Sequence, residues 1–232
     1  MNFVFKEFPD RKSLTVDLAE QIGKLLTAGI TDNGRASLAV SGGSTPVELF
    51  EQLSGMDLSW QDVVITLVDE RWVEPTEDDS NEHLVRSHLL KDKALAATFI
   101  GMKNSAATAS AGEKECEQKL REVPRPFDVL ILGMGGDGHT ASLFPGAKKL
   151  SLATDMDTGQ ACMGIAPLTA PHERMTLTLP AILDSRQIIL HITGQAKQDV
   201  LQEALTEGPT VEMPIRFILR QQTTPVSVFW AP

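Results

Sequence analysis

A glycine turn followed at once by a histidine is the stretch of this sequence best suited to chemistry. Residues 133–146 read GMGGDGHTASLFPG and place Asp137 and His139 directly after an apolar run. A helix dipole at a helix start opposes a cation, and a neutral imidazole can accept a proton near pH 7. We therefore expect His139 to be a general base at the start of a short helix, with Asp137 contacting the reacting groups or orienting a partner. The alternative is a histidine that merely caps that helix.

The glycines of this stretch also match a dinucleotide-binding pattern. Gly133, Gly135 and Gly138 form G-x-G-x-x-G. In dinucleotide-binding proteins this motif opens a long crossover helix, and an acidic residue follows about 20 positions later at a strand end. Here Pro145 and Gly146 stop any helix early, and the acidic residues at the right distance lie in LATDMDTG, which does not resemble a buried strand. We therefore expect no nicotinamide cofactor.

A second glycine-rich turn, SGGSTP at residues 41–46, lies between an apolar run and a helix pattern. Thr45 suits the N-cap, Pro46 the first helical position and Glu48 the third, which together predict a capping box. Glycine permits close backbone approach, and free amides at a helix start favour an anion. An ordinary strand-to-helix turn has the same composition. The candidate anion-binding residues are Ser41, Gly42, Gly43, Ser44 and Thr45.

Three cations stand at the ends of other expected elements. Arg71 follows an apolar run and can bind a phosphate through two N–H donors, while Asp69 beside it can accept a hydrogen bond from a sugar hydroxyl or a neighbouring loop. Arg174 opens a strand pattern. Lys197 lies in the first turn of a helix, where acidic residues are usual. These cations could gather around an anionic ligand, or they could be ordinary solvated side chains.

The remaining histidines and the cysteines show no metal-ligand spacing. His83 and His88 are five residues apart and do not share a helical face. His191 lies within an apolar run, which indicates a core or sheet residue. Cys116 and Cys162 stand alone, without a CxxC pair. We therefore expect no catalytic metal and no disulfide framework.

Composition narrows the class of protein. The 232 residues are 42% hydrophobic and 22% charged, which is typical of a globular chain. The net charge of −10 disfavours binding to nucleic acid or an acidic membrane, but local cations can still hold a small anion. The first residues do not resemble a signal peptide and no apolar run matches a membrane span, so we expect a cytoplasmic location.

Strand and helix patterns alternate along the chain. This alternation predicts one α/β domain over residues 1–232, built on a largely parallel sheet with helices on both faces. Ligands in such folds bind beyond the carboxyl ends of the strands, where the candidate residues fall. The expected strands are 2–8, 36–41, 62–70, 97–102, 127–134, 161–167, 174–179, 187–193 and 226–231, and the expected helices are 13–30, 46–54, 81–90, 109–121 and 195–207.

Taken together, these segments resemble the 6-phosphogluconolactonase family of the sugar-phosphate isomerase-like superfamily over residues 3–230. The matching segments are SGGSTP, VDERWV with SNEH, GMGGDGHTASLFPG, PHERMTLTLPAIL and ITGQAKQDVL. The related glucosamine-6-phosphate deaminases typically have DEY where this chain has DER at residues 69–71. They also typically have IAFNEPG where residues 140–146 read TASLFPG. Both differences favour the lactonase family.

The resemblance implies a Rossmann-like fold without a nucleotide, and hydrolysis of 6-phospho-D-glucono-1,5-lactone in the pentose phosphate pathway. The family's base falls on His139, and its phosphate-binding positions fall on residues 41–45, Arg71, Arg174 and Lys197. The implied partner is a small sugar-phosphate lactone, with no metal or organic cofactor, and we expect a monomer or weak homodimer. An isomerase or deaminase on the same fold, or a sugar-phosphate sensor that does not need His139, are the alternatives.

Overall fold

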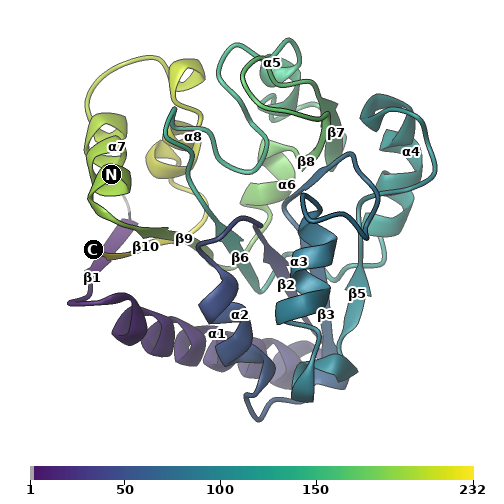
Figure 1. The fold of residues 1–232 in the computed structure, drawn as a ribbon, viewed down its shortest axis with the longest axis vertical. Helices are drawn as coiled ribbons and strands as arrows, with labels where there is room; N and C mark the ends of the chain where they lie inside the picture. The colour runs from purple at the N-terminus through teal and green to yellow at the C-terminus, as the bar shows by residue number, and fades with distance from the viewer. Residues whose placement is uncertain (1–2) are drawn as a thin grey trace.

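Parallel strands form the central sheet of the computed structural model, which describes residues 3–232. The sheet has seven strands among these residues, in the order β1-β10-β9-β6-β2-β3-β5 (Figure 1). Central strands such as β2 and β3 are buried along their whole length, because a parallel sheet is covered on both faces. The bounds are β1 Phe3–Glu7, β2 Ala36–Val40, β3 Val63–Leu67, β5 Thr98–Ile100, β6 Val129–Leu132, β9 Ile188–Thr193 and β10 Val226–Ala231. The predicted, mostly parallel sheet is confirmed.

A smaller antiparallel sheet stands beside the main one, in the order β4-β8-β7. Its strands are β4 Asp69–Arg71, β7 Cys162–Ile165 and β8 Arg174–Leu177. The single strand predicted over 62–70 is therefore wrong, because the chain changes sheets at Val68. The Val68 amide donates to Val40 of the main sheet, and the Val68 carbonyl accepts from Leu177 of the small one. This crossing carries Asp69 and Arg71 away from the main sheet.

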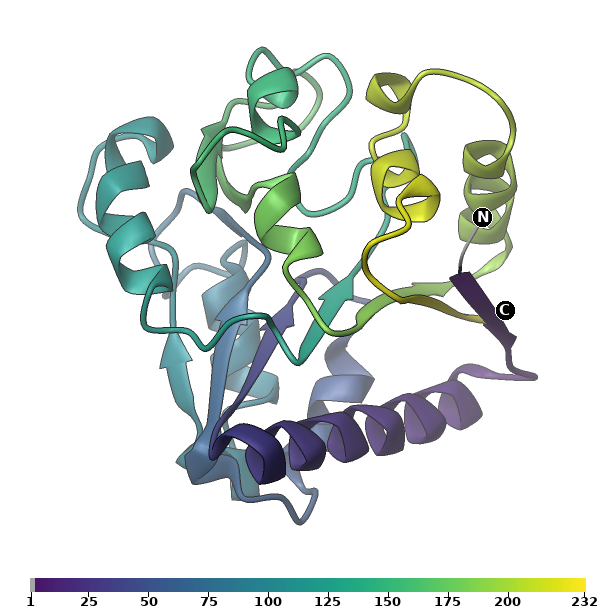
Figure 2. The same ribbon diagram turned by 180° about the vertical axis from the view of Figure 1, so that it is seen from behind.

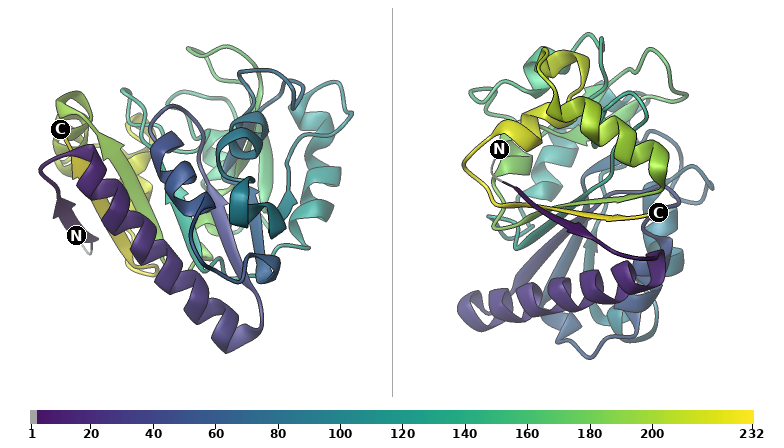
Figure 3. Two further views of the ribbon diagram at one scale, coloured as in Figure 1. Left: turned by 60° about the horizontal axis from the view of Figure 1, so that its bottom comes forward. Right: turned by 90° about the vertical axis from the view of Figure 1, so that its left-hand side faces the viewer.

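Helices cover both faces of the main sheet. Helix α1 (Arg11–Asn33) crosses one face and packs with α2 (Val47–Ser54), while α7 (Gln195–Leu205) and α8 (Ile215–Arg220) lie on the other (Figure 3). From behind, α1 is the long purple helix along the lower edge (Figure 2). The other helices are α3 Asn81–His88, α4 Ala109–Leu120, α5 Leu150–Ala153 and α6 Leu179–Leu183, with short 3-10 turns at Trp60–Asp62, Asp92–Ala96 and Thr210–Glu212.

The helix predicted over residues 13–30 is confirmed as α1, and its residues Leu14, Leu18, Ile22 and Leu26 are buried. Asp10 caps this helix by accepting from the Ser13 amide. No helix among residues 3–232 combines the length and the apolar character that a bilayer crossing requires.

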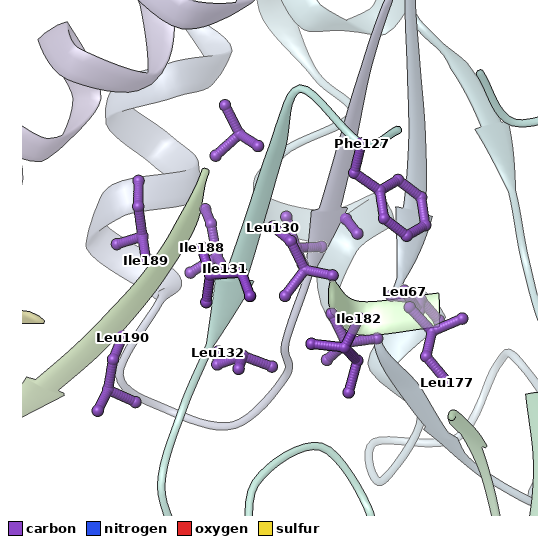
Figure 4. Close-up of a cluster of buried hydrophobic side chains, with 14 of the residues drawn as sticks. Leu67, Phe127, Leu130, Ile131, Leu132, Leu177, Ile182, Ile188, Ile189 and Leu190 are labelled. Carbon is purple, nitrogen blue, oxygen red and sulfur yellow. The ribbon is translucent and has the colours of Figure 1, made fainter. Parts of the chain in front are cut away.

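One buried cluster of apolar side chains joins the two sheets. Leu67 of β3, Leu177 of β8 and Ile182 of α6 pack together beside residues of β6 and β9 (Figure 4). Buried apolar area of this kind stabilises the fold by about 25 cal/mol per Å². Because residues of β6 and β9 belong to this cluster, the loops that follow these strands begin from a closely packed base.

The strand order contains a reversal between β2 and β6. From β2 the chain moves outward to β3 and β5, and it then returns to place β6 on the opposite side of β2. Ligands of open α/β sheets bind at such a reversal, beyond the carboxyl ends of the strands. The two glycine-rich turns predicted from the sequence follow β2 and β6, and so they meet at this point.

Candidate active site

A cavity of about 310 Å³ opens at the reversal between β2 and β6. It is lined by the turns after these two strands, by the end of β9 and the start of α7, and by β4 of the small sheet. The fold therefore gathers side chains from distant parts of the chain at one place. The predicted site residues among its lining are residues 41–45, Asp69, Arg71, His139 and Lys197.

Two predicted site residues, Arg174 and Asp137, do not line this cavity. Arg174 pairs with Arg71 across strands β4 and β8 and is only 6% exposed. Its Nη1 has no hydrogen-bond partner in the part of the chain that the structure describes, and burial together with the neighbouring Arg71 charge lowers the pKa of Arg174. Asp137 instead contacts His139. Arg174 is thus a buried charge beside Arg71, and Asp137 is a partner of the candidate base.

His139 does not start a helix, so that part of the prediction is wrong. Residues 139–149 form turns, with a bridge between Thr140 and Leu143 and with Ala141 at a φ of 47°. The Thr140 hydroxyl donates to the Gly133 carbonyl at 2.8 Å, which ties the turn back to the end of β6 and prevents helical winding. A helix dipole therefore has no part in setting the charge of the His139 ring.

The orientation of His139 depends on Asp137 and Phe144. His139 Nδ1 lies 2.5 Å from Asp137 Oδ1, and its amide also donates to this oxygen at 3.0 Å. Burial opposes the charge on Asp137, but the amide and ring of His139 outweigh it and hold the pKa of this carboxyl below its ordinary value. An ionised Asp137 needs a donor, so Nδ1 carries the proton and Nε2 is left as an acceptor.

Close packing around the His139 ring leaves it little freedom. The centroid of the Phe144 ring lies 4.2 Å from that of His139. On the other side, a Cβ at Gly135 would overlap the imidazole, so this position requires glycine. The amide of Gly135 also donates to the His139 carbonyl at 2.8 Å, which closes the turn.

The turn after β2 leaves its backbone amides open to the cavity. Helix α2 begins at Val47, with Pro46 at the N-cap in helical dihedrals and no side-chain cap hydrogen bond. The predicted capping box of Thr45 and Glu48 is therefore wrong, because Pro46 turns into the helix one residue later than expected and Thr45 stays exposed. No side chain within residues 3–232 caps the start of this helix, which suits an anion there.

Ser41 joins the two turns that meet at the reversal. Its hydroxyl donates to the Ile131 carbonyl at 2.9 Å and accepts from the Gly133 amide at 3.1 Å. Because these atoms lie on β6 and just after it, the anion-binding turn and the His139 turn are held in fixed relation.

Asp69 connects three loops of the site. Its Oδ2 accepts from the Ser142 hydroxyl at 2.6 Å, and its carbonyl accepts from the Asn81 side chain at 2.8 Å. A Cβ at Gly42 would overlap the Asn81 side-chain oxygen, so Asn81 also limits the approach of the turn after β2. Reasoning from residue chemistry did not assign a role to Asn81 or Ser142, although both lie in segments that carry the family resemblance. Asp69 therefore holds the loops of the site together through these hydrogen bonds.

Glu70 is fully buried beneath Arg71 and accepts four hydrogen bonds. They come from the amides of Arg71, Asn81 and Glu82 and from the Ser80 hydroxyl, at 2.7 to 3.1 Å. The carboxyl thus joins β4 to the start of α3. Burial raises the pKa of Glu70 to about 7, against the opposing effect of the three amides.

A pH dependence of stability follows from the raised pKa of Glu70. Between pH 4.5 and 7 the unfolded chain releases this proton while the folded chain keeps it, so the free energy of unfolding falls as pH rises through this window. The raised pKa of Glu70 thus contributes about 3 kcal/mol to the free energy of unfolding below pH 4.5, and this contribution is lost by pH 7. In urea unfolding, the wild type should lose stability relative to Glu70→Gln as the pH rises from 5 to 8, because glutamine does not titrate. The quantity to follow is the free energy of unfolding of the wild type minus that of the variant. A difference independent of pH would show that Glu70 is already ionised at pH 5.

Within residues 3–232, no group of three or more histidine, cysteine or carboxylate side chains is arranged to hold a metal ion. His88 pairs with Glu51 and His172 with Asp79, both at solvent-accessible positions outside the cavity. The chemistry available in the cavity is therefore that of the imidazoles of His139 and His191, backbone amides and cations.

Comparison with known proteins shows the family to which this chain is related. The family model described as glucosamine-6-phosphate isomerases/6-phosphogluconolactonase matches residues 9–230. The chain is 42% identical to a 6-phosphogluconolactonase of Rhizobium meliloti and 41% identical to one of Mesorhizobium japonicum, covering 97% and 100% of this chain and 97% and 96% of the relatives.

Solved structures agree with these sequence matches. The crystal structure of a 6-phosphogluconolactonase from Shewanella baltica is 49% identical and superposes with a TM-score of 0.97, covering 99% of this chain and 98% of that one. The chain therefore belongs to the glucosamine-6-phosphate isomerase/6-phosphogluconolactonase family.

Proposed function

We propose that this protein hydrolyses 6-phospho-D-glucono-1,5-lactone to 6-phospho-D-gluconate, the lactonase step of the oxidative pentose phosphate pathway. The observation that carries the proposal is the position of His139: its ring lines a cavity that also holds Lys197, Arg71 and the amide-rich turn at residues 41–45. The cavity can thus receive a ligand with an anionic end and a hydrolysable end. The names of relatives that are 41–49% identical over nearly the whole chain support this choice of ligand.

His139 acts as the general base in the proposed reaction. Its Nε2 is available as an acceptor because Nδ1 is directed to Asp137. As the oxygen of a water molecule bonds to the lactone carbonyl carbon, Nε2 takes a proton from that water and the carbonyl oxygen becomes an oxyanion. Asp137 stabilises the imidazolium that forms and keeps the ring in the required tautomer.

The breakdown of the tetrahedral intermediate needs donors and a proton. In the turn at residues 133–138, the amides of Gly133, Gly135 and Gly138 already donate to other groups of the protein. The amide of Met134, a residue of the cavity lining, is therefore the donor proposed for the oxyanion. When the carbonyl re-forms, the bond from its carbon to the ring oxygen breaks, and the His139 imidazolium returns its proton to that oxygen. The new carboxylic acid then loses a proton to water, so that each turnover releases one proton.

The phosphate group of the substrate binds to residues 41–45 and to the cations of the cavity. Helix α2 starts at this space without a side-chain cap, Lys197 lines it from α7, and Arg71 borders it from β4. Arg174 adds its buried charge beside Arg71. Fixing the phosphate positions the lactone carbon against His139, which lowers the entropic cost of the reaction.

The direct test is formation of 6-phosphogluconate from freshly prepared 6-phosphogluconolactone, corrected for spontaneous hydrolysis. We expect enzyme-dependent acid release that matches the amount of 6-phosphogluconate formed. No acceleration over the spontaneous rate would refute the proposal. Conversion of fructose 6-phosphate or glucosamine 6-phosphate instead would favour the isomerase and deaminase members of the family.

Activity should survive chelation, because the proposed chemistry uses only groups of the protein and water. After dialysis against EDTA, the rate of lactone hydrolysis is expected to stay within about twofold of the untreated enzyme, since no step is assigned to a Lewis acid. The measurement is the initial rate before and after dialysis, with Mg²⁺, Zn²⁺ and Mn²⁺ added back. Loss of activity and its recovery with one of these ions would contradict the proposed mechanism.

A further inference from the structure

A second histidine, His191, borders the same cavity. It lies on β9 and lines the cavity although only 4% of the residue is exposed. Strands β9 and β6 pair in register up to Leu190 and Leu132 (Figure 4). His191 is the next residue of β9, and Gly133 is the first residue after β6. A Cβ at Gly133 would meet no atom within 4 Å, which shows open space next to this position. The sequence pattern correctly predicted a buried sheet residue here but not its place at the cavity.

The two nitrogens of the His191 ring have different surroundings. Nδ1 is buried and has no hydrogen-bond partner among residues 3–232. Burial lowers the pKa of His191 to about 4, so at neutral pH the ring carries a single N–H. A buried N–H without an acceptor is rarer in proteins than a buried acceptor without a donor, so the proton belongs on Nε2. This leaves Nε2 as the donor that can serve the cavity.

The cavity places anion-binding groups around this donor. Lys197 follows His191 by six residues, at the start of the helix after β9, and the open turn at residues 41–45 forms another part of the lining. A neutral N–H can add a hydrogen bond to an anion there without placing a second cation beside Lys197, which like-charge repulsion would oppose.

We propose that His191 is a substrate-binding residue whose Nε2–H donates to the phosphate group held by Lys197 and residues 41–45. This assignment rests on the proposed lactonase function, because that function supplies the phosphorylated ligand. The assignment explains why a buried imidazole stands at the cavity wall. An aliphatic side chain at this position of β9 would pack equally well and would leave no buried nitrogen without a partner. Its loss should weaken binding of every ligand that carries the phosphate.

The test compares His191→Leu and His191→Gln with the wild type, using the stable product 6-phosphogluconate, inorganic phosphate and gluconate as probes. Leucine removes both nitrogens, whereas glutamine keeps an N–H near the position of Nε2. Calorimetric titration should show the Kd of His191→Leu for 6-phosphogluconate and phosphate raised by about 10-fold or more, as for a lost hydrogen bond to a charged group. His191→Gln should recover part of this loss, and binding of gluconate should change little.

Two further measurements separate binding from folding and from function. Leu190→Met, a volume-conserving change at the neighbouring position of β9, controls for disturbance of the strand. In the wild type, nitrogen NMR of the His191 ring should show the proton on Nε2 and a shift of its signal when phosphate is added. This measurement needs no variant and so is independent of whether His191→Leu folds.

The outcomes distinguish this inference from the proposed function. A proton on Nδ1, an unchanged ring signal at saturating phosphate, or a folded His191→Leu with wild-type Kd for 6-phosphogluconate would each overturn the role of His191. An equal loss of affinity for gluconate and 6-phosphogluconate would assign His191 to a sugar hydroxyl and would also overturn it. If the wild type fails to hydrolyse the lactone, the proposed function fails first.

Discussion

His139→Ala is expected to lower kcat for 6-phosphogluconolactone by on the order of 10²- to 10⁴-fold, the usual effect of losing a general base. The ring lines the cavity, and Asp137 holds it so that Nε2 can accept a proton. Because alanine removes this acceptor while leaving the phosphate-binding groups in place, KM should change much less than kcat. The measurement is steady-state kinetics on freshly prepared lactone, with the fold checked by circular dichroism.

His88→Ala is the matched control for this variant. His88 also pairs with a carboxylate, Glu51, at 3.1 Å, but it lies outside the cavity. Its replacement removes a histidine–carboxylate pair of the same type and should leave kcat unchanged. Near-wild-type turnover by a well-folded His139→Ala would remove His139 from the mechanism, and an equal loss in both variants would point to a general disturbance of the protein.

Lys197→Ala and Arg71→Ala are expected to remove most of the preference for the phosphorylated substrate. A hydrogen bond between a cation and a phosphate contributes about 1.5–3 kcal/mol, so kcat/KM for the phosphorylated lactone should fall by roughly 10- to 150-fold. Unphosphorylated glucono-1,5-lactone lacks the group that these cations bind, so its slow hydrolysis should change little. A loss confined to KM would indicate equal binding in ground and transition states, and a fall in kcat would show that the phosphate also positions the lactone.

Two controls make the phosphate result specific. Lys24→Ala removes an exposed lysine on α1 and matches the change in net charge. Arg174→Ala tests whether a buried cation that does not line the cavity acts through Arg71, and it should have a smaller effect on the phosphorylated substrate than Arg71→Ala. Equal losses on both lactones would mean that Lys197 and Arg71 support the fold or the lactone ring.

Most of the fold could be predicted because parallel strands and amphipathic helices have distinct patterns. The runs at β2 and β3 are buried on both faces and are mostly apolar, and α1 repeats its apolar residues at helical spacing. The change of sheets at Val68 was missed because the charged residues Asp69–Arg71 form β4 by pairing with β8, a contact that is distant in sequence. The local pattern of apolar residues predicts which segments are buried, but it does not predict which strands pair with each other.

Most of the candidate site residues named from the sequence line the cavity, whereas the local geometry predicted at Thr45 and His139 is wrong. Residues 41–45, Arg71, His139 and Lys197 follow strand ends, and the carboxyl ends of parallel strands meet at one edge. The helix expected at His139 is absent because the Thr140 hydroxyl bonds to the Gly133 carbonyl, a contact within the turn that no propensity reports. Asn81 and Ser142 were not assigned a role because their partner, Asp69, is distant from them in sequence.

The order of strands also affects when the protein can fold during its synthesis. Among residues 3–232, β1 is paired only with β10, so β1 has no partner in this sheet until β10 has been made. The strands β2, β3 and β5 are made earlier and can pair while translation continues, since domains form progressively as the chain emerges. Strand β9 and Lys197 also arrive late, and so a nascent chain can hold half of the sheet and still lack the complete cavity. Chains released before β9 is made would therefore expose β6 as an unpaired edge of the sheet, which makes incomplete translation products of this protein targets for chaperones and proteases.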